Sequence, residues 1–315
     1  MNKPIYKLRD WIDEEKLNWN FLCKNPFAID LIKTKPHRIN WYNLSLNPNA
    51  IEILEKNIER VHRCNISKNP NAIDLLLRYP EKICWSCISC NENAIDLLKK
   101  KQNKIHWRYL SYNTKCLEIL KHFPDKINWN LLSFNPNGIE LLKENLDKIN
   151  WGYLSQNPNA IEILQQNIDK IVWYNLALNP NAIKLIEKYI ENIDWNDLSK
   201  NPNGVDILKN NMDKINWYFL SKHPNAIDLL EKNQKHINWT YLSQNTAAIN
   251  ILKENQNKIN WTMFSANPAI FELDYEKMRK NMEKIEEEIL QVVLHPKRVM
   301  RYLKEYNYDI DDMYE

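Results

Sequence analysis

The chain has 315 residues, a net charge of +3 and only three glycines, Gly138, Gly152 and Gly204. Three isolated glycines exclude the glycine-rich loops that hold phosphates and dinucleotides, and no GxSxG or HExxH motif indicates a hydrolase. We therefore expect a protein that is not an enzyme and that has no cofactor and no small-molecule substrate. The sequence has no run of eighteen apolar residues and its start lacks the apolar segment of a secretory signal, so we expect a cytoplasmic protein that does not enter membranes.

Residues 1–18 are predicted to form an N-terminal helical cap. The segment KLRDWIDEEKLN reads as a polar helix, and Leu8 and Trp11 would cover the first apolar face of whatever follows.

Residues 19–271 consist of twelve copies of a 22-residue repeat. Tryptophan marks each copy, with Arg63 in its place in the third: Trp19, Trp41, Trp85, Trp107, Trp129, Trp151, Trp173, Trp195, Trp217, Trp239 and Trp261. We number the copies repeat 1 to repeat 12 and count positions from this residue as zero. A unit this short cannot bury its apolar face alone, so the copies must stack.

Each copy is predicted to contain two short helices. Asn or Asp at −1 would cap a first helix, WxxLS, and Asn at +6 followed by Pro at +7 would start a second helix, NAIxLLxxN. The tryptophans would form a continuous core. A small residue at +9 would allow close approach to the neighbouring copy, and Asn at +16 would end the second helix in a left-handed conformation.

Residues 272–315 carry twelve acidic and eight basic side chains and read as two amphipathic helices. They form either a C-terminal helical cap with an acidic tail or a partner-binding helix pair. The cap is favoured because an open solenoid end must be covered. The predicted fold is therefore an all-α, elongated solenoid of about twelve two-helix repeats with a helical cap at each end.

The unit INWxxLSxNPNAIxLLxxN resembles the leucine-rich repeat variant, a right-handed solenoid that alternates 3₁₀ and α helices. It is also similar to tandem-repeat proteins of giant DNA viruses of amoebae, which carry NPNAI units and a C-terminal segment like IFELDYEKM…HPKRVMRYLKEYNYDID. The resemblance implies a viral repeat protein without enzymatic activity, located in the host cytoplasm or in the virion. It implies no catalytic or binding residues.

Variable positions on the first helix predict where a partner binds. Positions +1, +2 and +5 lie opposite the buried face, and aromatic side chains gather there, which favours a protein partner. The predicted contact residues are Tyr109, Tyr112, Phe134, Tyr153, Tyr174 and Tyr218. The competing interpretation is that these rings only cover grooves between copies.

A basic row at +19 offers an alternative, nucleic-acid binding by one cation per repeat. Its members are Arg38, Arg60, Lys82, Lys104, Lys126, Lys148 and Lys170, continued by Lys214 and Lys258. An acidic row at +11 accompanies it. Because the net charge is small, we favour two solvated rows that make weak ion pairs.

A second alternative is a metal site at Cys84, Cys87 and Cys90, whose CxxCxxC spacing is typical of metal ligands, with Cys64 or a histidine as fourth ligand. The repeat does not require these cysteines, so we favour substituted repeat positions and no metal.

Overall fold

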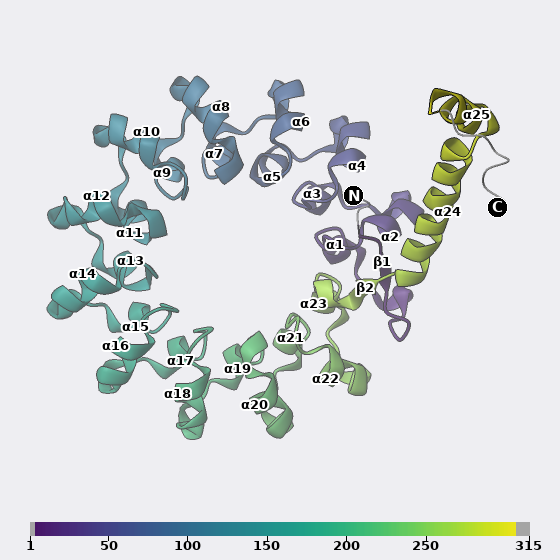
Figure 1. Cartoon of the computed structure of the whole chain (residues 1–315). Coiled ribbons are helices and arrows are strands. Elements are labelled where there is room, and N and C mark those ends of the chain that lie inside the picture. Colours follow the sequence, from purple (N-terminus) through teal and green to yellow (C-terminus); the bar gives the residue numbers. More distant parts are fainter. Residues whose placement is uncertain (1–3, 307–315) are drawn as a thin grey trace. The chain divides into compact units, whose positions relative to one another are not determined.

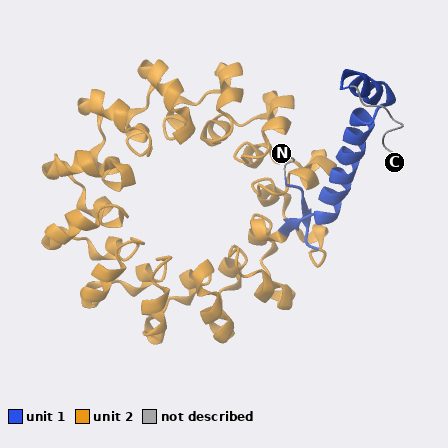
Figure 2. Cartoon of the chain, viewed as in Figure 1, with its two compact units in different colours: residues 1–9, 271–315 blue, residues 10–270 orange. Residues whose placement is uncertain are grey.

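The computed structural model describes residues 4–306, which fall into two compact units. Residues 10–270 form the first, called here the ring unit, and residues 1–9 and 271–315 belong to the second, the terminal unit (Figure 2). The described residues are 64% helical when the 25 α-helices and the 3₁₀ helices are counted together, and these elements recur in a regular pattern. The predicted all-α repeat solenoid is confirmed. Among the described residues, no helix is both long enough and apolar enough to span a bilayer.

Every repeat begins with a first helix, which is α-helical. Where the residue before it is Asn or Asp, that side chain caps the helix as predicted; Asn150, for example, accepts a hydrogen bond of 3.0 Å from the Tyr153 N–H. The first helices are α1 (Trp19–Leu22), α3 (Trp41–Leu44), α5 (Arg63–Lys68), α7 (Trp85–Ile88), α9 (Trp107–Leu110), α11 (Trp129–Phe134), α13 (Trp151–Gln156), α15 (Trp173–Leu176), α17 (Trp195–Leu198), α19 (Trp217–Leu220), α21 (Trp239–Leu242) and α23 (Trp261–Phe264).

The second helix begins at +10, four residues later than the predicted Asn–Pro start. These helices are α2 (Ile29–Thr34), α4 (Ile51–Lys56), α6 (Ile73–Arg78), α8 (Ile95–Lys100), α10 (Leu117–His122), α12 (Ile139–Lys143), α14 (Ile161–Gln166), α16 (Ile183–Lys188), α18 (Val205–Lys209), α20 (Ile227–Lys232) and α22 (Ile249–Glu254). The Asn–Pro segment before them is a turn, or a 3₁₀ helix in η5 (Glu92–Ala94), η8 (Pro136–Gly138), η13 (Pro224–Ala226) and η16 (Pro268–Ile270).

A third element, not predicted, is a 3₁₀ turn at +17 to +19. These turns are η1 (Glu14–Lys16), η2 (Pro36–Arg38), η3 (Ile58–Arg60), η4 (Pro80–Lys82), η6 (Gln102–Lys104), η7 (Pro124–Lys126), η9 (Leu146–Lys148), η10 (Ile168–Lys170), η11 (Ile190–Asn192), η12 (Met212–Lys214), η14 (Gln234–His236) and η15 (Gln256–Lys258). The left-handed helix end predicted at +16 was wrong: Asn167 has φ −137°. Its side chain instead donates to the Ile163 carbonyl, four residues earlier, at 2.9 Å.

The core is aliphatic rather than aromatic. The side chain at +3 is fully buried in every repeat, whereas Trp19 alone of the marker tryptophans is buried and the others are half-exposed. The predicted continuous tryptophan core is therefore wrong. The small residue at +9 is needed inside one copy, not between copies: a Cβ on Gly138 would lie 2.8 Å from the carbonyl oxygen of Leu132 in the same repeat.

Consecutive repeats are joined by buried asparagines at +6, which form what we call the asparagine ladder. Asn157, for example, donates from its side chain to the carbonyls of Ser133 and Asn135 in the preceding repeat, at 3.0 and 2.9 Å. Its side-chain oxygen accepts from the N–H of Asn159 at 3.0 Å. Buried backbone groups need hydrogen-bond partners. This asparagine supplies them to two carbonyls of the preceding repeat and to one N–H of its own repeat.

The asparagine ladder does not stop at repeat 1, because repeat 12 stands before it. Asn25 donates to the carbonyls of Ser265 and Asn267 at 3.3 and 2.9 Å, and the Asn18 N–H donates to the Ser265 hydroxyl at 2.8 Å. The same bonds join all neighbouring copies that carry these residues. The ring unit is therefore closed (Figure 2), and this contact of repeat 12 with repeat 1 is its seam. The predicted elongated array with a cap at each end is corrected, because repeat 12 bonds directly to repeat 1.

Residues from both ends of the ring unit make up repeat 12. Its first helix, α23, lies late in the chain, but its 3₁₀ turn is η1, at the start. Lys16 in η1 lies over the Trp261 ring at 5.3 Å, as the +19 cations lie over their own tryptophans. Trp11 stacks on Phe264 at 5.9 Å. The predicted polar helix at residues 7–18 is not formed, because Leu17 and Asn18 are already the extended residues that lead into α1.

The terminal unit pairs strand β1 (Tyr6–Leu8) with strand β2 (Phe271–Leu273) in an antiparallel two-stranded sheet, with Lys7 opposite Glu272. Glu272 accepts from Arg9 at 2.9 Å. Helices α24 (Tyr275–Val293) and α25 (Pro296–Glu305) follow, as predicted for this amphipathic segment. Neither helix has a buried residue. The end of the predicted acidic tail, residues 307–315, lies outside the described residues.

Candidate functional site

The two helices of each repeat form two rows in the ring unit. In Figure 1 the first helices, with odd numbers from α1 to α23, form the inner row, and the second helices form the outer row. The buried residues of the first helices, at +3 and +4, lie between these rows. The exposed positions +1, +2 and +5 are therefore on the inner circumference, which we call the inner face.

Exposed aromatic rings gather on the inner face. Six tyrosines at positions +1, +2 and +5 are 41–58% exposed: Tyr42, Tyr109, Tyr112, Tyr153, Tyr174 and Tyr218. Five of them were predicted contact residues. Tyr42 was missed, although it occupies +1, the position that Tyr174 and Tyr218 also occupy.

Two groups of rings touch each other across repeats. In the first aromatic patch, Phe134 stacks on Tyr112 at 5.8 Å and meets the edge of Tyr153 at 6.2 Å. The patch thus spans repeats 5, 6 and 7. Tyr109, another predicted contact residue, lies against His106 at 4.5 Å, and Tyr174 is exposed one repeat beyond the patch.

The second aromatic patch lies in repeats 10 and 11. Tyr218 contacts Phe219 and Tyr241, and its hydroxyl is hydrogen-bonded to that of Tyr241 at 2.7 Å. Phe219 and Tyr241 line a pocket of about 510 Å³ together with Lys200, Lys222 and His223. Burial lowers the pKa of His223, so the lysines are the cations of this pocket near neutral pH.

Cations outnumber anions on the inner face. The basic side chains at +1, +2 and +5 are Lys24, Lys68, Arg108, Lys200 and Lys222, and the acidic one is Asp197. The outer row differs, because its eleven helices are nearly neutral: thirteen acids, nine of them at +11, accompany twelve bases. Some of these acids pair with a lysine of the preceding repeat, as Glu162 does with Lys143 at 2.9 Å. The inner face is therefore the positive side of the ring unit.

The basic row at +19 has a structural use. Four of its seven predicted members lie over the tryptophan of their own repeat at 4.6–5.4 Å from the ring centre: Arg38, Arg60, Lys148 and Lys170. Lys214 and Lys258 do the same. Lys126 pairs with Asp125 at 3.0 Å, and Lys82 and Lys104 end their 3₁₀ turns. Covering a half-exposed indole with a cation accounts for this row without a nucleic acid.

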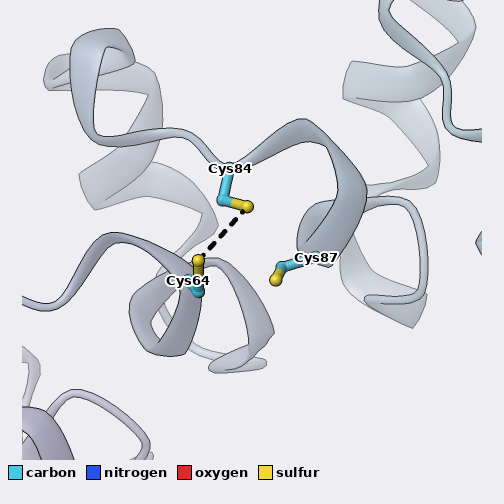
Figure 3. Close-up of side chains that lie close together, drawn as sticks. All are labelled: Cys64, Cys84 and Cys87. Carbon is cyan, nitrogen blue, oxygen red and sulfur yellow. Dashed lines mark hydrogen bonds between the residues drawn. The ribbon is translucent and has the colours of Figure 1, made fainter.

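The structure groups the cysteines differently from the sequence spacing. The sulfur atoms of Cys64, Cys84 and Cys87 all lie within 4.8 Å of one another, and those of Cys64 and Cys84 are 3.5 Å apart (Figure 3). Cys90 does not belong to this group of close sulfur atoms. Its thiol donates instead to the carbonyl of Cys87 at 3.0 Å. Cys64, predicted only as an optional fourth ligand, takes its place.

The pKa values of the Cys84 and Cys87 thiols are shifted in opposite directions. Burial raises the pKa of the Cys84 thiol, but hydrogen bonds with Ser86, Cys87 and Cys64 outweigh burial and bring that pKa to about 7. Burial and the neighbouring Cys84 thiolate raise the pKa of Cys87 to about 12. The Cys84 thiolate is thus available near neutral pH while Cys87 remains protonated.

No protein-family model, no curated protein and no solved structure matches this chain.

Proposed function

We propose that the ring unit is a binding scaffold without enzymatic activity, and that it holds an acidic segment of a partner protein on its inner face. The observation that carries this proposal is the first aromatic patch, in which the exposed rings of Tyr112 and Tyr153 and the partly buried ring of Phe134 between them are in contact over three repeats. Exposed contiguous rings on a soluble protein are typical of interaction surfaces, and aromatic anchors dominate interface energies.

The charge of the inner face supports an acidic partner. Five cations and one anion lie there, and Lys200 and Lys222 line the pocket beside the second aromatic patch. Lys200 pairs with the anion, Asp197, so Lys222 is the cation of the pocket that this pair leaves for a partner. A carboxylate entering that pocket would meet the ammonium group of Lys222, and apolar neighbours in the same segment would meet the rings. Complementary charge of this kind gives specificity and faster association.

Nucleic acid is the weaker candidate. The row predicted to follow its phosphates is largely occupied, because four of its seven members lie over indole rings. In the first aromatic patch, the rings contact one another rather than standing apart as platforms for bases.

Binding of labelled synthetic peptides to the full chain tests the proposal. The probes are peptides of about twelve residues rich in Glu and Asp with interspersed Leu and Phe, matched peptides with Gln and Asn in place of the acids, and single-stranded oligonucleotides. We expect the acidic peptides to bind best, and Tyr112→Ala combined with Phe134→Ala to weaken them by roughly tenfold or more, about 1.4 kcal/mol. Salt is expected to weaken binding.

The matched control is Leu146→Ala, which removes an exposed apolar side chain that lies outside the first helices. It is expected to leave peptide binding unchanged. If no acidic peptide binds, or if the oligonucleotides bind more tightly and lose affinity on Lys104→Glu and Lys126→Glu, the proposal is wrong.

A further inference from the structure

Cys64, Cys84 and Cys87 come from two consecutive repeats and meet at one place. Cys64 lies in the first turn of α5, Cys84 immediately precedes α7, and Cys87 lies within α7. Figure 3 shows the three sulfur atoms facing a common space between these elements. No other group of three potential metal ligands of this closeness occurs among the described residues 4–306.

The spacing of the sulfur atoms fits a shared metal ion. A zinc ion holds thiolates at about 2.3 Å, so two sulfur ligands of a tetrahedral ion lie roughly 3.8 Å apart. The sulfurs here are 3.5 Å apart in one pair and within 4.8 Å in all. Small side-chain rotations would bring them to the required separation, without movement of either helix.

Hydrogen bonds hold together the two elements that carry the cluster. Arg63, the residue that replaces tryptophan in repeat 3 alone, donates from Nε to the carbonyl of Ile83 at 2.7 Å. This bond ties the first residue of α5, next to Cys64, to the residue before Cys84. Ser86 also lies within 3.3 Å of the Cys84 sulfur.

We propose that Cys64, Cys84 and Cys87 bind one zinc ion, with the fourth coordination position open to solvent. All three ligands are soft sulfur donors, which select zinc and other thiophilic ions over Mg²⁺ and Ca²⁺. All three residues are partly exposed, so an exchangeable fourth ligand can enter. The ion would join repeat 3 to repeat 4, at the one repeat in which Arg63 replaces the tryptophan.

Zinc titration of the reduced full-length chain, with Co²⁺ as a spectroscopic probe, tests this site. We expect one ion per chain, with sulfur-to-cobalt charge-transfer absorption, and a higher melting temperature with zinc. Cys64→Ser, Cys84→Ser and Cys87→Ser are each expected to reduce affinity by at least about tenfold. Cys90→Ser is the matched control, because it removes a neighbouring thiol outside the cluster, and it is expected to bind as the natural protein does.

Alkylation of the natural protein gives a second measurement that does not depend on how the variants fold. Zinc is expected to protect Cys64, Cys84 and Cys87 from iodoacetamide, as read by peptide mass spectrometry, and to leave Cys90 at its metal-free rate. Absence of stoichiometric zinc, equal loss of affinity on Cys90→Ser, or protection that includes Cys90 but not Cys64 would overturn the proposal. So would a Cys64–Cys84 disulfide that forms equally fast with zinc present.

Discussion

Replacing Asn157 with alanine is expected to lower the free energy of unfolding by roughly 3 kcal/mol. The change removes three hydrogen bonds of a fully buried side chain: two to the carbonyls of Ser133 and Asn135, and one from the N–H of Asn159. Each buried polar group left without a partner costs about 1–3 kcal/mol. Alanine can replace none of these bonds. Chemical denaturation followed by circular dichroism measures the loss.

Asn159→Ala is the matched control for this prediction. Asn159 lies two residues later in the same NPN segment and also reaches the preceding repeat, donating from its side chain to the carbonyl of Pro136 at 3.0 Å. It is exposed, however, so water replaces the lost bond and the expected cost is below about 1 kcal/mol. Equal losses for the two variants would show that the asparagine ladder is not what joins the repeats.

Replacing Asn25 with alanine is expected to cost about as much as replacing Asn157, roughly 3 kcal/mol. Asn25 belongs to repeat 1, and its partners across the seam are the carbonyls of Ser265 and Asn267 at 3.3 and 2.9 Å. In a closed ring this residue is an ordinary member of the asparagine ladder. In an open solenoid it would face solvent, because no repeat would precede it.

Comparing the loss of unfolding free energy in Asn25→Ala with that in Asn157→Ala distinguishes a closed ring from an open solenoid. A loss for Asn25→Ala below about 1 kcal/mol, beside a large loss for Asn157→Ala, would contradict closure. Ser265→Ala provides an independent check from the other side of the seam, because its hydroxyl accepts from the Asn18 N–H. We expect it to match Ser133→Ala, whose hydroxyl accepts from the Asn150 N–H at an internal joint.

The repeat pattern was sufficient to predict the helices, because caps and apolar spacing are local signals. It did not predict what the polar residues do between copies. Asn at +6 reads locally as a helix cap, yet its bonds run to residues 22 and 24 positions earlier. The role of tryptophan was likewise misjudged. Its partner, the cation at +19, follows it in sequence, but only the 3₁₀ turn at +17 to +19 brings the two together.

Closure of the ring depends on a rotation of about 30° per repeat, a small geometric quantity that the residues of one repeat do not reveal. A signal nevertheless existed. Terminal repeats of an open array are normally modified into polar caps. Here both terminal repeats retain a residue that bonds to a neighbouring repeat, namely Asn25 in repeat 1 and Ser265 in repeat 12. Their retention is what an array without ends requires.

The candidate sites were predictable only where neighbouring copies align in register. Tyr112 and Phe134 occupy the same position in consecutive repeats, so their contact follows from the 22-residue period. The cysteine cluster does not follow from any single helix. Cys64 at +1 meets Cys84 at −1 of the next repeat, a diagonal contact that requires the packing of α5 against α7. The local CxxCxxC spacing therefore predicted Cys90 as a metal ligand, whereas the structure brings Cys64 to Cys84 and Cys87.

Amide hydrogen exchange at the seam tests the closed ring most directly. The Asn18 N–H, which donates to the Ser265 hydroxyl at 2.8 Å, is compared in the natural protein with the Asn150 N–H, which donates to Ser133 at 3.0 Å inside the array. A closed ring predicts similar protection for both, and for the surrounding residues 18–27 and 261–270. Rapid exchange of Asn18 and of both flanking segments, with Asn150 still protected, would show two frayed ends and contradict closure.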